Sequence, residues 1–534
     1  MKKLASFFVA ARMYISATSC ESLYFGKEKN MRDMVNVTFE VQTPQTRSQT
    51  DTDGNDSYVS STDGTEAGTD AENNINNVQL IFADQDGNYI TDAEISSTVG
   101  TRGQYVVAFK SEDLEKKAGK TVKVYLQCNT PKVTVDGGAN TPSNINFLDA
   151  TFDATSTEIY AKANAFYMTN AQAVSFNIPS DLKPYTSETT PLDLGIIVVE
   201  RAAARFDIGP ASTESKTYNT SVGGYKVVDG LYIKLTDIAM VNISRDQYYY
   251  RRVSADGSNN NEVISGVEMP NNYVVDVDWA TKRAYNGSNT PGDFVAGTTY
   301  EEFRTSMSNS KWWTSLSSLN QDDSYDGSYK IWRYTSENTL PAVAGTPATP
   351  VTATMNNSTG VVFRGKLVVT DALTDTDLKN GLSSPQTYGT IYAYDNVILG
   401  NWARVKALAE TAGNEDKAFS IAYKAAVALG GDGEANAKDC GFVPYTPNSN
   451  GYEMVYLYWN RHNDNKDNTE NGVMEFATVR NNVYKLAVDE ITKLGYPFNG
   501  DTPPGDTKVE QEEVFFKVRV KVLPWVVRKN AIEF

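Results

Sequence analysis

The chain closes with EVFFKVRVKVLPWVVRKNAIEF, residues 513–534, and its pattern sets the expectations for the whole fold. Alternate positions in it are apolar, and this period of two is the pattern of a β-strand with one buried face. The apolar set is Val514, Phe516, Val518, Val520 and Val522. Pro524 lacks a backbone donor, so we expect the ladder of hydrogen bonds to be interrupted there and a second extended piece to follow. The apolar residues of that second piece are Trp525, Val527, Ile532 and Phe534.

A long apolar strand at a chain end can pair within its own sheet or add itself to the sheet of another molecule. Residues 501–511 contain prolines and charges, and we expect them to form a linker that releases the strand from the domain body. Residues 513–534 are therefore a candidate donor strand that enters a neighbouring copy.

A second alternating stretch, residues 34–43, has the pattern of another half-buried strand. Its apolar face consists of Val35, Val37, Phe39 and Val41. Arg47 follows, and then residues 48–74, which carry seven acidic residues and no basic one. Such a polar segment has little to bury and exposes the bond between Arg47 and Ser48 to a trypsin-like protease. Cleavage there would remove the first strand and open a place in the sheet, which the C-terminal strand of another copy has the pattern to fill.

Composition narrows the class of protein. The chain has 534 residues with 40% hydrophobic content, which is sufficient for two globular domains. Its formal net charge of −17 argues against nucleic-acid binding, because phosphate contacts need a basic surface. At the N-terminus, two lysines, an apolar run and small residues precede Cys20, which predicts a signal peptide over residues 1–19 and a lipid (palmitate) anchor on Cys20. The alternative is a cytoplasmic N-terminus, because Arg12 interrupts the apolar run.

The rest of the chain reads as mainly β. From residue 76 onward, short β-branched runs alternate with turn residues. We expect an N-terminal β-domain over residues 48–195 and a C-terminal β-domain over 196–534. The second domain carries long loops and a helical insertion over about 401–430, in which Phe419, Tyr423 and Ala426 share one face. Arg201 and Arg205 interrupt an apolar run and are expected to point outward or to form structural ion pairs.

The long irregular region 244–338 is rich in aromatic residues. They include Tyr248, Tyr249, Tyr250, Trp312 and Trp313. We expect them to form the small cores of long loops, with a sugar-stacking platform as the alternative.

Residues that could support catalysis are sparse. His462 is the only histidine, lies in a polar loop and has no nucleophile near it in the sequence; no GxSxG elbow or phosphate loop is present. Cys128 and Cys440 match no CxxC spacing, so they predict isolated buried thiols, with one disulfide as the alternative, and no zinc site. The sequence therefore predicts no enzymatic activity, no cofactor and no metal.

Several stretches of the chain resemble a known family. They are YLYWNRHNDN (456–465), GVMEFATVRNNVYKLAVDEITKLGYP (472–497) and FKVRVKVLPWVVRKNAIEF (516–534), with weaker echoes in VERAAAR (199–205), FYMTN (166–170) and YTSENTL (334–340). In these stretches the chain resembles the fimbrillins, the major fimbrial subunits of Bacteroidales type V pili, and most closely the Mfa-type short-fimbria subunit.

The resemblance implies two β-sandwich (transthyretin-like) domains and a precursor that is anchored at the outer membrane through Cys20. An arginine-specific protease would remove residues 20–47 with the first strand, and Arg47–Ser48 matches that cleavage site by position. The mature chain would join other copies of itself in a surface fimbria with accessory and anchor subunits, supporting adhesion and biofilm formation through host or bacterial surface ligands. Two alternatives stay open: a fimbrial tip or accessory adhesin, and a monomeric glycan-binding surface lipoprotein.

Overall fold

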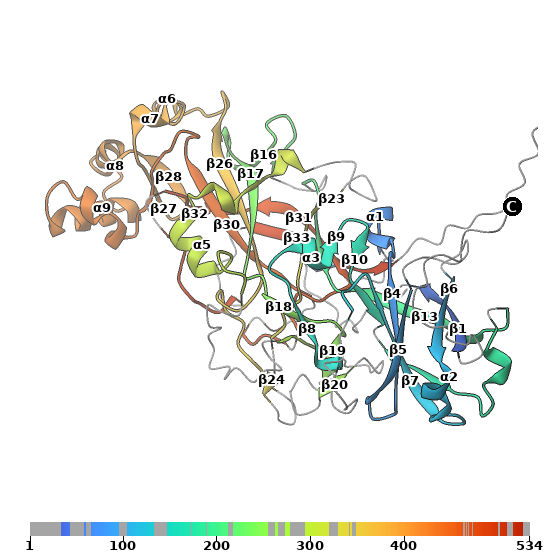
Figure 1. Cartoon of the computed structure of the whole chain (residues 1–534). Coiled ribbons are helices and arrows are strands. Elements are labelled where there is room, and N and C mark those ends of the chain that lie inside the picture. The colour runs from blue at the N-terminus through green and yellow to red at the C-terminus, as the bar shows by residue number, and fades with distance from the viewer. Residues whose placement is uncertain are drawn as a thin grey trace, which may run out of the picture.

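The computed structural model is mainly β and elongated, with its smaller domain and its helical insertion at opposite ends (Figure 1). It describes residues 34–42, 58–59, 66–95, 104–132, 147–170, 172–187, 189–211, 217–254, 262–264, 273–277, 294–319, 329–340, 342–343, 349–462, 465, 467, 469–472, 474–499, 502–509 and 516–526. Within these residues, no helix has both the length and the apolar character needed to cross a membrane.

The N-terminal domain is built on one sheet that curls until its two end strands meet. In spatial order the strands are β5 (Tyr89–Ile95), β4 (Val78–Ala83), β7 (Thr121–Cys128), β11 (Met168–Asn170), β13 (Leu192–Arg201), β1 (Met34–Gln42) and β6 (Gln104–Lys110), with β12 (Val174–Asn177) also on β7. The curled sheet encloses a core of aliphatic and aromatic residues, among them Leu80, Phe109 and Leu126. Small elements decorate it: α1 (Asp70–Asn73), α2 (Ser111–Glu115), α3 (Thr157–Tyr160), β8 (Thr151–Asp153), β9 (Ala161–Lys162) and β10 (Ala165–Phe166).

The C-terminal domain is a sandwich of two sheets around a second core. One sheet has the order β2 (Tyr58–Val59), β33 (Phe516–Val526), β31 (Asn482–Ile491), β14 (Ala204–Ile208) and β23 (Lys330–Thr335), with β3 (Glu66–Ala67) also on β33. The other has the order β15 (Tyr218–Asn219), β16 (Gly224–Val228), β17 (Leu231–Val241), β26 (Gly360–Val369), β30 (Glu453–Trp459) and β32 (Tyr496–Pro497), with β22 (Thr314–Ser315) on β17. The helix α5 (Tyr300–Ser306) contributes Tyr300 and Phe303 to a third core with Trp312 and Trp459.

The helical insertion lies far from the N-terminal domain (Figure 1). It comprises α6 (Thr376–Leu382), α7 (Pro385–Tyr388), α8 (Trp402–Ala409) and α9 (Ala418–Leu429), with the strands β27 (Ile391–Tyr394), β28 (Val397–Gly400) and β29 (Val443–Tyr445). Tyr423 and Ala426 are buried and Phe419 packs beside them, which confirms the predicted helix face. Short strands complete the loops: β18 (Asp246–Tyr248), β19 (Arg252–Ser254), β20 (Glu262–Ile264), β21 (Tyr273–Val275), β24 (Ala342–Val343) and β25 (Thr349–Pro350).

Four expectations from the sequence can be compared with this architecture. The proposed domain boundary at 195/196 falls inside β13, and the chain changes sheet between Arg201 and Ala204. The ladder between β31 and β33 ends at Pro524, opposite Asn482, as expected, but the strand β33 itself continues to Val526, where it pairs with β3. His462, which the sequence places in a polar loop, is buried, with Nδ1 2.9 Å from the hydroxyl of Tyr484. Cys128 and Cys440 are unpaired; Cys128 is buried, which raises the pKa of its thiol, while Cys440 is half-buried.

The aromatic residues of the loop region form loop cores, as expected. Tyr250 is fully buried against Tyr125 and Phe147, and Trp312 packs edge-on against Phe303. Because Tyr250 and Trp312 are buried, they do not provide a surface for sugar stacking.

Candidate functional site: the slot filled by the first strand

The first strand, β1, occupies an interior position in the N-terminal sheet. It pairs antiparallel with β6 from Met34 opposite Lys110 to Glu40 opposite Gln104. On its other side it pairs parallel with β13, from Val37 opposite Leu192 onward. Both neighbours therefore depend on β1 for backbone hydrogen bonds, and its removal would leave two facing rows of unpaired donors and acceptors. We call the space between β6 and β13 the slot.

The inward face of β1 fills the centre of the N-terminal core. Val35, Val37 and Phe39 are at most 1% exposed, and Phe39 stacks on Tyr105 with ring centroids 5.5 Å apart. Val41 is half-buried and packs on the same core. Burying the three fully buried side chains stabilises the domain by roughly 5–9 kcal/mol at about 1.5–3 kcal/mol each. That is comparable with the whole net stability of a typical domain, about 5–15 kcal/mol, so the loss of β1 would strongly destabilise the N-terminal domain.

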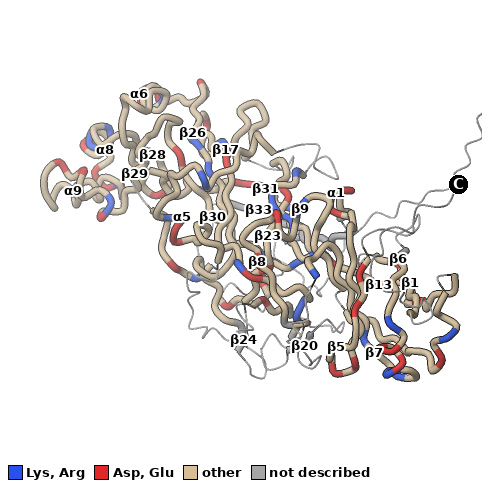
Figure 2. Tube along the Cα trace, viewed as in Figure 1, with Lys and Arg blue, Asp and Glu red and all other residues tan. Residues whose placement is uncertain are grey.

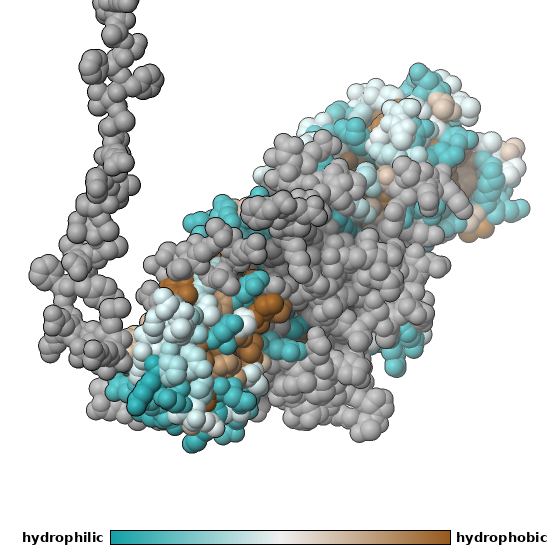
Figure 3. Space-filling view, turned by 90° about the vertical axis from the view of Figure 1, so that its right-hand side faces the viewer, coloured by the Kyte–Doolittle hydropathy of each residue, from teal (hydrophilic) through white to brown (hydrophobic). Residues whose placement is uncertain are grey.

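A bulge in β13 shapes one wall of the slot. The register between β1 and β13 shifts between Thr38 and Glu40, opposite Gly195, whose φ is +71°. The amide of Gly195 donates to Asp193 Oδ1 at 2.9 Å, which closes the bulge. Beyond it, Ile196 and Val198 are 50% and 40% exposed on the outer side of the sheet. Figure 3, which views this end of the molecule, shows apolar residues reaching the surface among hydrophilic ones.

The alternating C-terminal strand is paired within its own domain. Residues 516–526 form β33, which pairs antiparallel with β31 from Phe516 opposite Ile491 to Pro524 opposite Asn482. Val518 is 4% exposed and belongs to the core between the two sheets of the C-terminal domain. The expected release of residues 516–526 by the preceding linker is therefore wrong in this state of the chain. Two non-local partners, β31 and the core, hold them.

The other predicted site residues fall into two groups. Cys20, Arg47 and Ser48 lie outside the described residues, as do Val514, Val527, Ile532 and Phe534. For Phe516, Val520, Val522 and Trp525 the structure gives the backbone pairing within β33. Their roles in cleavage, lipidation and strand donation stay predictions.

The chain segment after the predicted cleavage site returns to the C-terminal domain. Tyr58 and Val59 pair parallel with Val520 and Lys521, and Glu66 and Ala67 pair with Trp525 and Val526. The segment thus covers the outer edge of β33, whereas β1 belongs to the N-terminal sheet. Removing β1 would take away one strand of the first domain and leave the edge cover of the second in place.

Val518→Lys tests the placement of β33. We expect the substitution to destabilise the C-terminal domain by several kcal/mol, because it places an ammonium group without a carboxylate partner in an apolar core. Chemical denaturation followed by tryptophan fluorescence measures the loss. Lys226→Ala, at an exposed position of β16, is the control and should change the stability by no more than about 0.5 kcal/mol. A Val518→Lys chain as stable as the control would contradict the placement.

A buried ionic network joins the two domains, and sequence patterns gave little sign of it. Arg205 Nη1 lies 3.1 Å from Glu72 Oε2, and Arg205 Nη2 lies 2.7 Å from Asp207 Oδ2. Tyr334 donates its hydroxyl to Glu72 Oε1 at 2.7 Å, and burial together with the Glu72 carboxylate raises the pKa of that phenol. Of the two earlier expectations for Arg205, the structural ion pair is confirmed and the outward position is wrong.

The neighbouring Arg201 is also fully buried, which lowers its pKa to about 10. Its Nε donates to the carbonyl of Glu72 at 3.1 Å and its Nη2 donates to Asn73. Both acceptors come from α1, which lies at the end of the acidic segment 48–74. The network therefore fixes α1 at the junction, where Figure 2 shows charged residues of both signs close together.

A second buried ion pair, between Arg480 and Glu337, joins the residues just before β31 to the neighbouring loops. Arg480 forms a two-point contact with Glu337, Nε to Oε2 at 2.9 Å and Nη2 to Oε1 at 3.0 Å. The same guanidinium donates to the carbonyls of Tyr248 and Tyr249. The Tyr249 carbonyl also accepts from Thr169 of β11, so the contacts of Arg480 extend to the N-terminal sheet.

Comparison with known proteins gives one family match. Residues 449–531 match the family model described as "Major fimbrial subunit protein type IV, Fimbrillin, C-terminal". This segment contains β30, β31 and β33. No curated protein sequence matches the chain.

The solved structures that the comparison found include two from Porphyromonas gingivalis. A fimbrillin (FimA) of strain W83 is 13% identical, with 93% of this chain and 98% of that chain covered and a TM-score of 0.39. The tip fimbrial protein Mfa3 is 10% identical, with 92% and 100% covered and a TM-score of 0.35. Likenesses at this level carry no inference about function. The fimbrillin match agrees with the resemblance read from the sequence and with a structural, non-enzymatic class; the narrower Mfa-type resemblance stays a prediction.

Proposed function

We propose, from the fimbrillin C-terminal family to which residues 449–531 belong, that this chain is a structural subunit of a bacterial surface fimbria. We infer further that it polymerises by strand exchange. Strand exchange is supported by the interior position of β1, which has hydrogen-bonded neighbours on both sides and a fully buried face. Cleavage after Arg47 would empty the slot, and a strand from another copy would refill it.

The C-terminal residues beyond β33 are the part of the chain that is best suited to donate. Withdrawing β33 itself would break nine residue pairs with β31 and expose Val518, at roughly 1 kcal/mol for each lost hydrogen bond in addition to the lost burial. Residues 527–534 follow directly after β33 and include the apolar Val527, Ile532 and Phe534. We therefore narrow the donor from residues 513–534 to 527–534, with β33 as its anchor.

The geometry of such an exchange favours a filament. The slot lies in the N-terminal domain, whereas the proposed donor leaves the C-terminal domain, so each copy has one acceptor and one donor at different places. A head-to-tail contact of this kind does not close on itself unless the rotation returns to the start. We propose further that the precursor is exported and lipidated at Cys20. The filament would contain anchor and accessory subunits and would adhere to surface ligands.

Cleavage with an arginine-specific protease tests the mechanism. We expect the purified full chain to stay monomeric until it is cut, and then to form a ladder of oligomers on unheated gels and fibres in electron micrographs. Arg47→Gln should stay monomeric under the same treatment, because the slot stays filled. Arg32→Gln is the matched control and should polymerise normally, since Arg32 precedes β1. Loss of residues 1–47 without any oligomer would contradict strand exchange, although the fimbrial assignment would stand.

A further inference from the structure

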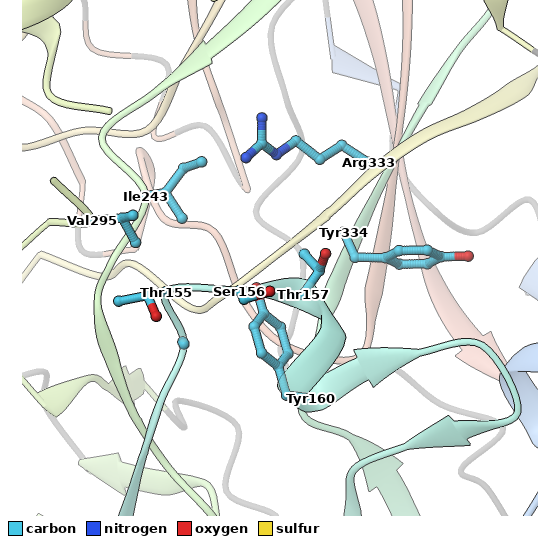
Figure 4. Close-up of a pocket in the computed structure, with 9 residues that line it drawn as sticks. Thr155, Ser156, Thr157, Tyr160, Ile243, Val295, Arg333 and Tyr334 are labelled. Atoms are coloured by element: carbon cyan, nitrogen blue, oxygen red, sulfur yellow. The ribbon is translucent and has the colours of Figure 1, made fainter. Parts of the chain in front are cut away.

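A small polar cavity of about 180 Å³ lies where the two domains meet. The loop before α3 contributes Thr155, Ser156 and Thr157 from the N-terminal domain, and Ile243 and Arg333 come from the C-terminal domain (Figure 4). In this view the guanidinium of Arg333 extends over the Thr155–Thr157 loop toward Ile243, while Tyr334 turns away toward the other side of its strand. The cavity is thus lined by both domains, is open to solvent on one side and has a single cationic group in its wall.

Arg333 differs from the other arginines of the junction. Arg205, Arg251 and Arg480 each have a carboxylate partner, and Arg201 bonds α1. Arg333 forms no hydrogen bond or ion pair with any residue in the described part of the chain. Burial lowers the pKa of Arg333, while the nearby phenol of Tyr160 acts in the opposite direction. A guanidinium carries five donors, and leaving them without acceptors in a partly desolvated place is unfavourable.

The hydroxyl groups opposite Arg333 have spare hydrogen atoms. Ser156 Oγ accepts from the amide of Glu158 at 3.3 Å, which leaves its own hydrogen available to donate. Thr157 has no hydrogen-bond partner for its side chain among the described residues. Thr155 differs, because it bonds Asp153, whose carboxylate also lies near Arg245. The free donors of the cavity therefore come from Arg333, Ser156 and Thr157, and they suit an acceptor-only group.

We propose that this cavity binds a carboxylate group. The guanidinium of Arg333 would donate to both carboxylate oxygens, and the hydroxyls of Ser156 and Thr157 would be further donors. A planar guanidinium matches a carboxylate at two points, and such charge-assisted bonds are about twice as strong as neutral ones. The volume of the cavity suits one carboxylate with a few attached carbon atoms, for which Ile243 and Val295 provide an apolar wall. The carboxylate can belong to a free small acid or to an acidic sugar of a surface polysaccharide.

The test uses the full chain and two probes, sodium acetate and sodium glucuronate, against sodium chloride at equal ionic strength. We expect both carboxylates to raise the melting temperature in a saturable way, and isothermal titration to detect binding. Arg333→Gln should weaken binding at least tenfold, and Ser156→Ala should weaken it a few-fold. Arg245→Gln is the matched control, because its guanidinium is exposed and already paired with Asp246; it should bind as the wild type does.

Folding of the variants is not expected to obscure the result. Arg333→Gln removes a charge that lacks a partner, so its melting temperature in chloride should equal or exceed that of the wild type. Should it fail to fold, Arg333→Lys keeps the charge without the two-point contact and should weaken binding three- to tenfold. Tighter binding of glucuronate than of acetate assigns the site to a sugar acid, and equal binding assigns it to free small acids. Absence of saturable binding to the wild type, or unchanged binding by Arg333→Gln, would overturn the proposal; fibre formation is independent of either outcome.

Discussion

A chain that ends at Val526 is expected to fold as the full chain does and to form no fibres after cleavage at Arg47. The truncation keeps all of β33, including Val518 and the pairing with β31, so the C-terminal core stays intact. It removes residues 527–534, the segment proposed to enter the slot of the next copy. Circular dichroism and thermal unfolding measure the fold, and electron microscopy with unheated gels measures assembly. The expected effect is complete loss of polymer at unchanged monomer stability.

Point variants test whether the apolar side chains of residues 527–534, and not the length of the chain, are needed for assembly. Ile532→Asp combined with Phe534→Asp should block assembly as the truncation does, because carboxylates without partners would enter an apolar slot. Lys529→Gln, which changes a polar residue of the same segment, is the control and should assemble normally. Fibres of normal length from the truncated chain would show that another segment fills the slot.

Arg480→Met is expected to destabilise the protein by about 3–5 kcal/mol, because it leaves Glu337 buried without its cation. Arg480 and Glu337 are both fully buried, and the two carbonyls that accept from Arg480 lose their donors as well. The pair joins β31 to the loop carrying Tyr248 and Tyr249, so the loss should also weaken the junction between the domains. Urea denaturation gives the free energy of unfolding.

Two further variants test whether the loss comes from the uncompensated charge. Arg480→Met with Glu337→Met should regain part of the stability, since neither charge then lies buried alone. Lys226→Met removes an exposed partner of Asp229 and should change the free energy of unfolding by no more than about 1 kcal/mol. A loss below 1 kcal/mol for Arg480→Met would show that the buried pair contributes little.

Local patterns in the sequence were sufficient for several elements of the fold. The alternation over Val35, Val37 and Phe39 predicted both the strand and its buried face, because side chains in a strand point to opposite sides in turn. The insertion at α9 followed in the same way from helical spacing and from the glycines after Leu429. The match of residues 449–531 to fimbrillins agrees with the stretches that suggested the family.

The partner of each strand and of each buried charge became known from the folded structure. The alternation over residues 514–522 is the same whether the strand joins its own sheet or a foreign one, and the answer lies in β31 and the core around Val518. Arg205 and Glu72 stand 133 residues apart, so no local pattern shows that they neutralise each other in the interior. Arg333 and its cavity arise where the two domains meet. Which faces are apolar could be predicted from the residues alone, because that depends on spacing along the chain. What those faces and charges touch depends on contacts between distant segments, which form only on folding.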